Sequence, residues 1–221
     1  MKQIYENLYQ FSVYIPPMNF TIHQYLLASD PAILFATGTA QQAKAVLPEI
    51  QKILGDRELK YIFVSHVESD EAGGVFVFRE AYPDVIVLCS GLAARELPGW
   101  GYDGAIARMS AADELVDDKL SLFFADYPSE VHDQNGIVCF EKNSGIAYSA
   151  DLFLRYGGEN GGTMRAKWSD EVNAISVERI VCNEKREALK KALLEWKPSF
   201  VAVGHGFCLE CDSTATINRR K

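Results

Sequence analysis

The sequence predicts an α/β fold in which two mixed sheets pack face to face with helices outside. Two observations predict it: apolar strands are followed by an amphipathic helix in the first half of the chain, and the same order recurs in the second half. The 221 residues are 48% hydrophobic and 24% charged, which suits one domain with a sizeable core and argues against disorder. We expect residues 1–221 to form this single domain.

The first half opens with antiparallel strands. Aromatic and β-branched residues at short spacing predict strands at Tyr9–Ile15, Thr21–Leu27 and Ala32–Ala36. Thr37-Gly38-Thr39 then caps a helix, which Pro48 is expected to kink or restart.

The next part of the chain alternates between predicted strands and helices. Buried strands at Tyr61–Ser65 and Val85–Leu88 alternate with helices at Ala72–Tyr82 and Gly91–Leu97. This alternation is typical of parallel strands joined by crossover helices.

The second half repeats the order. A strand at Leu122–Ala125 precedes a hairpin of Ile137–Glu141 and Ile146–Ser149, a helix at Glu184–Trp196 and a closing strand at Phe200–Val203.

Composition excludes several function classes. The net charge of −8 argues against a nucleic-acid partner, and no stretch approaches eighteen consecutive apolar residues, so no membrane span is expected. The N-terminus lacks a signal-peptide core, and the five cysteines are an odd number. We therefore expect a cytoplasmic protein without a disulfide framework.

The sharpest chemical feature follows the strand that ends at Ser65. His66, Glu68 and Asp70 are spaced by two, so an extended chain points them to the same side. Glu71 faces elsewhere unless the chain turns, as it could at Ala72-Gly73-Gly74. These six residues hold three carboxylates and one imidazole. The carboxylates repel one another, and removing them from water costs free energy unless a cation lies among them. A solvated loop is the alternative.

Other candidate ligands also lie beside predicted strand ends, where sheets assemble sites. His132 is in the loop before the hairpin, Asp151 follows the strand that ends at Ser149, and His205 follows the closing strand. His23 differs because it lies inside an alternating strand, so we interpret it as structural.

These residues resemble the metal-binding motifs of the metallo-β-lactamase fold, specifically the diiron domain of flavodiiron proteins. That family carries H-x-E-x-D-H, a distant His, a bridging Asp and a final His. His66, Glu68 and Asp70 match the first motif, and the later positions match His132, Asp151 and His205. The opening Tyr5–Met18 and Thr37-Gly38 also look like this branch, so the resemblance spans nearly the whole chain.

The resemblance implies a concrete site. One iron would take His66, Glu68 and His132, and the other would take Asp70, His205 and Glu71, while Asp151 and a solvent-derived oxygen bridge them. Hydrolytic members of the fold usually carry a His where Glu68 stands, which favours zinc there. The mixed carboxylate and imidazole set favours iron here, with zinc or manganese as alternatives.

Two departures from the family pattern matter. Glu71 stands where the family has a sixth-position His, and it is either a carboxylate ligand or a lost ligand. The chain also ends without the flavodoxin-like domain, so no FMN is expected in it. It resembles a stand-alone oxygen-binding diiron protein.

The resemblance implies O₂ or NO as ligand. The chain would act as an oxygen sensor with a signalling partner, or as an O₂/NO reductase fed by a rubredoxin or flavoprotein; a homodimer is an expectation by analogy. The rival function is a metal-dependent hydrolase of the same fold, and a scaffold without metal is a third.

Cys208 and Cys211 form a C-x-x-C three residues after His205. The pair is either a redox dithiol near the metals or two cysteines in a partly buried turn.

Overall fold

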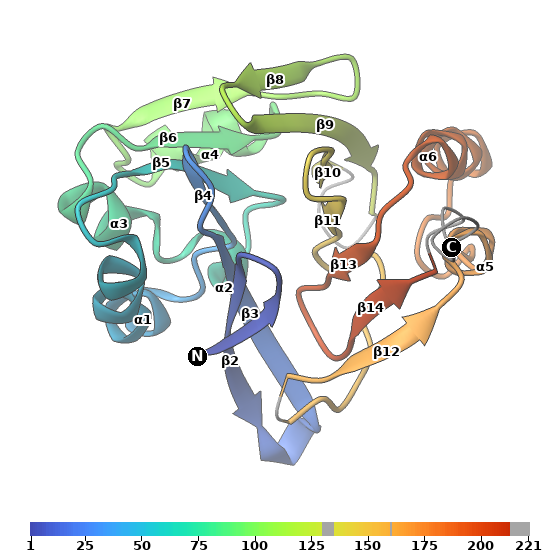
Figure 1. The fold of residues 1–221 in the computed structure, drawn as a ribbon. Coiled ribbons are helices and arrows are strands. Elements are labelled where there is room, and N and C mark those ends of the chain that lie inside the picture. The colour runs from blue at the N-terminus through green and yellow to red at the C-terminus, as the bar shows by residue number, and fades with distance from the viewer. Residues whose placement is uncertain (130–134, 160, 213–221) are drawn as a thin grey trace, which may run out of the picture.

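The computed structural model describes residues 1–129, 135–159 and 161–212. In that part of the chain, two seven-stranded sheets pack face to face with helices on both outer sides (Figure 1). This is the αββα sandwich of the metallo-β-lactamase fold, as the sequence predicts.

The first sheet follows chain order. Its strands are antiparallel from β1 to β4 and parallel from β4 to β7. They are β1 (Lys2–Tyr5), β2 (Leu8–Ile15), β3 (Phe20–Leu27), β4 (Ala32–Phe35), β5 (Leu59–Val64), β6 (Ile86–Cys89) and β7 (Ala105–Arg108).

The second sheet is also mixed. Its spatial order is β12 (Thr163–Ala166), β14 (Cys208–Cys211), β13 (Phe200–Ala202), β11 (Ile146–Tyr148), β10 (Gly136–Glu141), β9 (Leu120–Tyr127) and β8 (Glu114–Asp117). The predicted hairpin is β10–β11, paired antiparallel, and β11 pairs with β13 in parallel.

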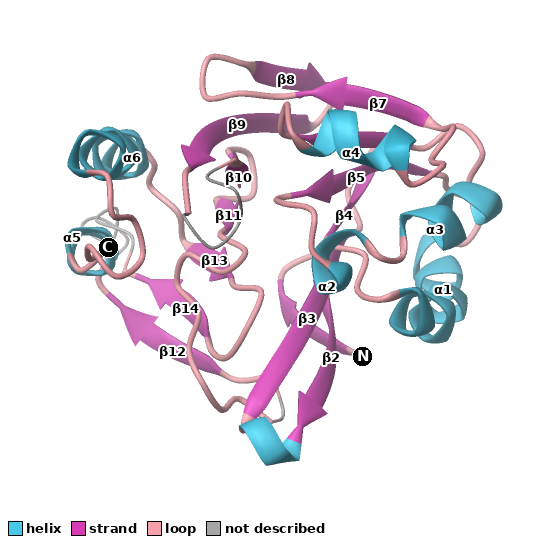
Figure 2. Ribbon diagram, turned by 180° about the vertical axis from the view of Figure 1, so that it is seen from behind, coloured by secondary structure: helices cyan, strands magenta, loops and turns pink. Residues whose placement is uncertain are grey.

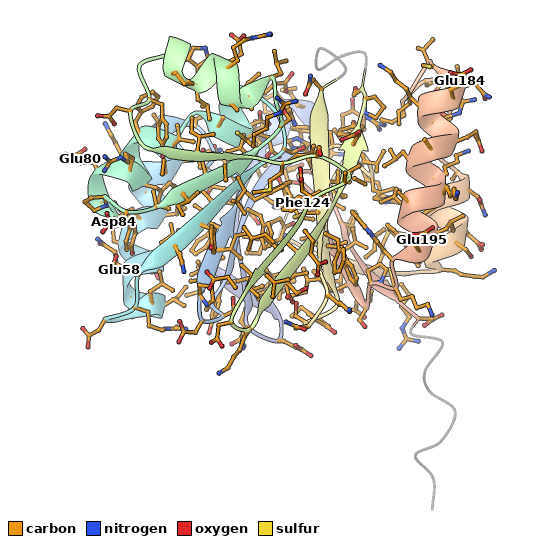
Figure 3. All side chains as sticks on the ribbon, turned by 90° about the horizontal axis from the view of Figure 1, so that it is seen from above. Glu58, Glu80, Asp84, Phe124, Glu184 and Glu195 are labelled. Carbon is orange, nitrogen blue, oxygen red and sulfur yellow. The ribbon has the colours of Figure 1, made fainter. Side chains whose placement is uncertain are left out.

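The helices cover the two outer faces. The helices on the first sheet are α1 (Ala40–Leu54), α3 (Val75–Ala81) and α4 (Ala93–Gly99). Those on the second sheet are α5 (Trp168–Asn173) and α6 (Asn183–Glu195). A short 3-10 turn, η1 (Pro16–Met18), joins β2 to β3. Figure 3 places Glu80 of α3 and Glu184 of α6 on opposite outer sides, with Phe124 between the sheets. No helix among the described residues is long and apolar enough to cross a membrane.

Two predicted helices need correction. α1 begins at a capping box between Thr39 and Gln42, as expected, but it continues through Pro48 without restarting. Pro48 and Lys44 are both exposed, so water can hydrate the Lys44 carbonyl that loses its helical donor.

The helix predicted at Ala72–Tyr82 is divided. A short turn, α2 (Ser69–Ala72), ends at Gly73-Gly74 and α3 follows. A Cβ at Gly74 would lie 2.5 Å from the Cβ of Ala43, so glycine allows the start of α3 to approach α1.

Aromatic side chains join the two sheets. Phe63 of β5 is fully buried and stacks on Phe124 of β9 with ring centroids 6.1 Å apart. Phe35 of β4 stacks in the same way on Tyr148 of β11, at 5.5 Å. These contacts lie in the core that holds the sandwich together.

We expect Phe63→Ala to lower the free energy of unfolding by about 3–5 kcal/mol, because it leaves a cavity between the sheets. Phe76→Ala, at a ring that is 40% exposed, should cost less than about 1.5 kcal/mol. Urea unfolding with a chelator present would measure both, and equal losses would contradict the assignment of Phe63 to the shared core.

Candidate metal centre

The predicted ligands converge where strands of both sheets end. His66 follows β5, Asp151 follows β11 and His205 follows β13. Backbone hydrogen bonds hold these segments across the sandwich: Ile137 N donates to Ser65 O at 3.0 Å, and His23 N donates to Gly204 O at 3.0 Å. In Figure 2 the turn α2 lies on the face turned toward the viewer, in front of β3.

Asp151 lies between two histidines. Its Oδ2 is 3.7 Å from Nε2 of His66, and its Oδ1 is 2.9 Å from Nε2 of His205. Glu68 Oε2 lies 3.6 Å from Nε2 of His66, and Asp70 Oδ2 lies 3.5 Å from Nε2 of His205. The structure therefore arranges these five residues as two groups that share Asp151.

The arrangement suits metal coordination. One ligand atom from each of His66, Glu68 and Asp151 lies within 4.8 Å of the others. Imidazole nitrogens and carboxylate oxygens so close together can hold a transition-metal ion.

His205 is oriented by its backbone neighbours. Its Nδ1 donates a hydrogen bond to the carbonyl of Thr21 at 2.8 Å, which leaves Nε2 toward the two aspartates. Its ring also stacks on Phe20, with centroids 4.3 Å apart.

The chain turns at the first motif before Ala72-Gly73-Gly74, where the sequence predicts a turn. Glu68 is extended, but Asp70 and Glu71 lie in the turn α2. The turn brings Glu71 into the interior, where only 3% of it is exposed and where Tyr148 donates a hydrogen bond to Oε1 at 2.5 Å.

The charges of the site raise several pKa values. Burial opposes protonation of His66, but the hydrogen bond that its ring donates to Glu68 and the charges of Glu71 and Asp151 outweigh burial and raise the pKa of His66 to about 9. Burial raises the pKa of Glu71 to about 7, with Asp151 adding to the effect while His66 and the Tyr148 hydrogen bond oppose it. The excess of acids thus attracts positive charge, either protons or a cation.

Ala150 positions Asp151 at a cost. Its φ of 44° lies in the left-handed region that non-glycine residues rarely adopt, and its carbonyl accepts from Gly204 N at 2.8 Å. Strain of this kind clusters at functional sites.

A family model matches most of the chain. The family described as ODP family beta lactamase matches residues 20–206. The chain belongs to this family. Solved structures of other proteins share its fold at low sequence identity, so that likeness by itself shows the fold alone.

Three relatives illustrate the likeness. Rubredoxin oxygen:oxidoreductase from Desulfovibrio gigas superposes with a TM-score of 0.77 at 16% identity, covering 95% of this chain and 57% of that one. A fragment of diflavin flavoprotein A 5 from Nostoc gives 0.74 at 16%, covering 92% and 85%. A curated relative, putative diflavin flavoprotein A 2 from Nostoc, is 24% identical over 135 residues, which are 60% of this chain and 23% of that protein. The ODP-family chain thus spans about a quarter of the curated relative and about half of the oxidoreductase.

The remaining predicted residues are placed as follows. His132 lies outside the described residues. Cys208 and Cys211 lie on β14 rather than in a turn, so strand alternation points them to opposite faces. Burial raises the pKa of Cys208 to about 11 and that of Cys211 to about 12, and both thiols are free. This geometry does not favour a redox dithiol.

Sequence reasoning missed the groups that orient the ligands. Tyr148 and Thr21 carry no motif signal, because their partners lie 77 and 184 residues away in the chain. From the sequence, Tyr148 is only one residue of the predicted hairpin strand Ile146–Ser149.

His23 is structural, as interpreted from the sequence. It is 1% exposed; its Nε2 donates to the carbonyl of Gly206 at 2.9 Å, and its Nδ1 accepts from Ser12 Oγ at 2.8 Å. Neither ring nitrogen remains to bind metal. Its bond to Gly206 holds the segment beside His205 in place.

His23 should make stability depend on pH. Burial lowers its pKa from the usual 6.5 to about 4, so the unfolded chain takes up the proton first as the pH falls. Its stabilising contribution is complete above pH 6.5 and is lost towards pH 4, on the order of 2 to 3 kcal/mol at pH 4.5. The free energy of unfolding should be measured at pH 7 and pH 4.5 with a chelator present throughout. The loss of stability between the two pH values should be smaller in His23→Gln than in the wild type. An equal loss in both proteins would contradict the role of His23.

Proposed function

We propose that this domain holds two iron ions and binds O₂ or NO. The observation that carries the proposal is the carboxylate of Asp151, which contacts the Nε2 atoms of both His66 and His205. A carboxylate shared by two imidazole-acid groups is what two neighbouring metal ions require of a bridging ligand.

The donor set divides between two ions. His66 and Glu68 would hold one, together with His132 by resemblance, and Asp70, His205 and Glu71 would hold the other. The chemistry of the donors supports iron: carboxylates outnumber imidazoles among the described residues of the set, and hard oxygen ligands suit a metal that changes oxidation state. When bound, iron would supply open positions for a diatomic ligand and one-electron chemistry.

The chain's own residues prepare the site. Thr21 fixes the tautomer of His205 so that Nε2 is left to ligate. Burial of Asp151 and His66 excludes water from their ligand atoms.

We propose that the domain binds O₂ or NO in either of two roles. It would act as a sensor with a signalling partner, or as a reductase with an external electron donor such as a rubredoxin or flavoprotein. The name of the Desulfovibrio relative, which pairs rubredoxin with oxygen, supports this chemistry. The described cysteines form no disulfide, which suits a reducing cytoplasm.

Anaerobic purification and metal analysis should find about two iron ions per chain, and titration with O₂ should change the visible absorption. A chelator should lower the melting temperature, because free metal at a hundredfold excess over its Kd stabilises by about 2.7 kcal/mol. A colourless protein that contains zinc and hydrolyses esters or lactams would favour the hydrolase instead. If a chelator leaves the melting temperature unchanged, the protein has no metal centre.

Asp151→Asn should remove most of the bound iron, because an amide bridges two cations far less well than a carboxylate. Asp103→Asn is the matched control, since that side chain is 87% exposed and pairs with Arg79 rather than with a candidate ligand. Elemental analysis of both variants decides the point: equal iron contents would contradict the role of Asp151.

A further inference from the structure

The Tyr148 ring is fixed in the core. It stacks on Phe35 at 5.5 Å and meets Phe63 edge-on at 5.9 Å and Tyr25 at 6.1 Å. Tyr148 is fully buried, so its hydroxyl has no water to bind and points to Oε1 of Glu71. The direction of this hydroxyl is therefore set by packing on several sides of the ring.

Glu71 is fixed from its backbone as well. Its carbonyl accepts from the Thr37 amide at 2.7 Å and from Thr37 Oγ1 at 2.9 Å, and Thr37 Oγ1 in turn accepts from Gly74 N at 3.0 Å. These bonds anchor α2 to the end of β4. The Glu71 carboxylate lies within electrostatic reach of His66, Asp70 and Asp151.

One oxygen of Glu71 is left without a partner. Within residues 1–129, 135–159 and 161–212, Oε2 of Glu71 makes no hydrogen bond although it is buried. Leaving a buried carboxylate oxygen unsatisfied is costly unless a cation or donor fills the place.

Glu141 gives an internal comparison. It is equally buried, at 2%, yet its Oε1 accepts from the amides of Ser121 and Asn143, and its Oε2 accepts from the amide and hydroxyl of Ser144. A buried carboxylate with a structural role in this fold thus has both oxygens satisfied. Glu71 has only Oε1 satisfied, by the hydroxyl of Tyr148.

We propose that Tyr148 is a positioning residue that binds Oε1 of Glu71 and so presents Oε2 to a metal ion as a ligand. The Tyr148–Glu71 pair would then serve where the resembled motif has a histidine. This inference rests on the proposed function and adds the ligand and its orienting group. If it is wrong, Tyr148 merely satisfies a buried carboxyl group that binds no metal.

The test uses Tyr148→Phe in the full chain, which keeps the ring packing and removes only the hydroxyl. Ferrous iron is titrated anaerobically into the metal-free protein, and the binding constants of the two ions are compared with those of the wild type. Loss of a group that orients a ligand typically weakens metal binding about 10- to 100-fold, and we expect this at one of the two ions.

Tyr25→Phe is the matched control. Tyr25 is also fully buried, and its hydroxyl donates to the carbonyl of Val203 at 2.7 Å rather than to Glu71. Both variants should lower the melting temperature of the metal-free chain, but only Tyr148→Phe should weaken iron binding. Equal iron affinity in Tyr148→Phe and the wild type would overturn the proposal.

Glu71→Gln completes the cycle. It should also weaken one iron, and the double variant with Tyr148→Phe should bind no more weakly than Glu71→Gln alone, because the tyrosine acts through the glutamate. A further loss of the same size in the double variant would show that Tyr148 acts independently and would overturn the positioning role. If the wild type binds no iron, the proposed function itself is wrong. If the wild type binds two iron ions and Tyr148→Phe binds them with the same affinity, only the positioning role of Tyr148 is wrong.

Discussion

The site depends on hydrogen bonds that tie loops of one sheet to strands of the other. His205 Nδ1 donates to Thr21 O at 2.8 Å, Gly206 N donates to Thr21 Oγ1 at 2.8 Å, and Ile137 N donates to Ser65 O at 3.0 Å. Each bond joins a segment next to a candidate ligand to the opposite half of the sandwich. The sheets therefore cannot slide without moving the ligands, and the aromatic contacts between Phe63 and Phe124 resist such sliding.

Such a rigid frame can hold an arrangement that is unfavourable by itself. The acids around His66 and His205 repel one another, and the left-handed Ala150 adds strain beside Asp151. Local features that oppose stability are expected where function selects them. The core, which buries large aromatic residues on both sides of the site, supplies the stability that offsets them.

Much of the fold followed from periodicity, and the failures have physical causes. The central strands are buried and apolar, so their pattern predicted them. The missed strands β1, β7, β8 and β12 form the edges of the two sheets and contain no fully buried residue, so no buried apolar pattern marks them. The strand β14 was missed as well, because its C-x-x-C spacing does not by itself indicate a strand. Candidate ligands were predictable because they follow strand ends. Tyr148 was not, because a hydrogen bond between residues 77 apart depends on how the two sheets meet.

The meaning of a short motif depends on the backbone that carries it. His66 and Glu68 lie on extended chain, where a spacing of two puts both side chains on one side. One step later the chain turns into α2, and consecutive residues such as Asp70 and Glu71 can both approach the cluster although an extended chain would separate them. In β14 the backbone stays extended, so the spacing of three in C-x-x-C separates the thiols across the sheet: Cys208 contacts Tyr25 Oη at 3.1 Å between the sheets, while Cys211 lies near Glu171 of α5. A helical turn would have placed the same two cysteines side by side. Backbone conformation, which residue spacing alone does not fix, thus decides which of the chain's polar motifs can act as a unit.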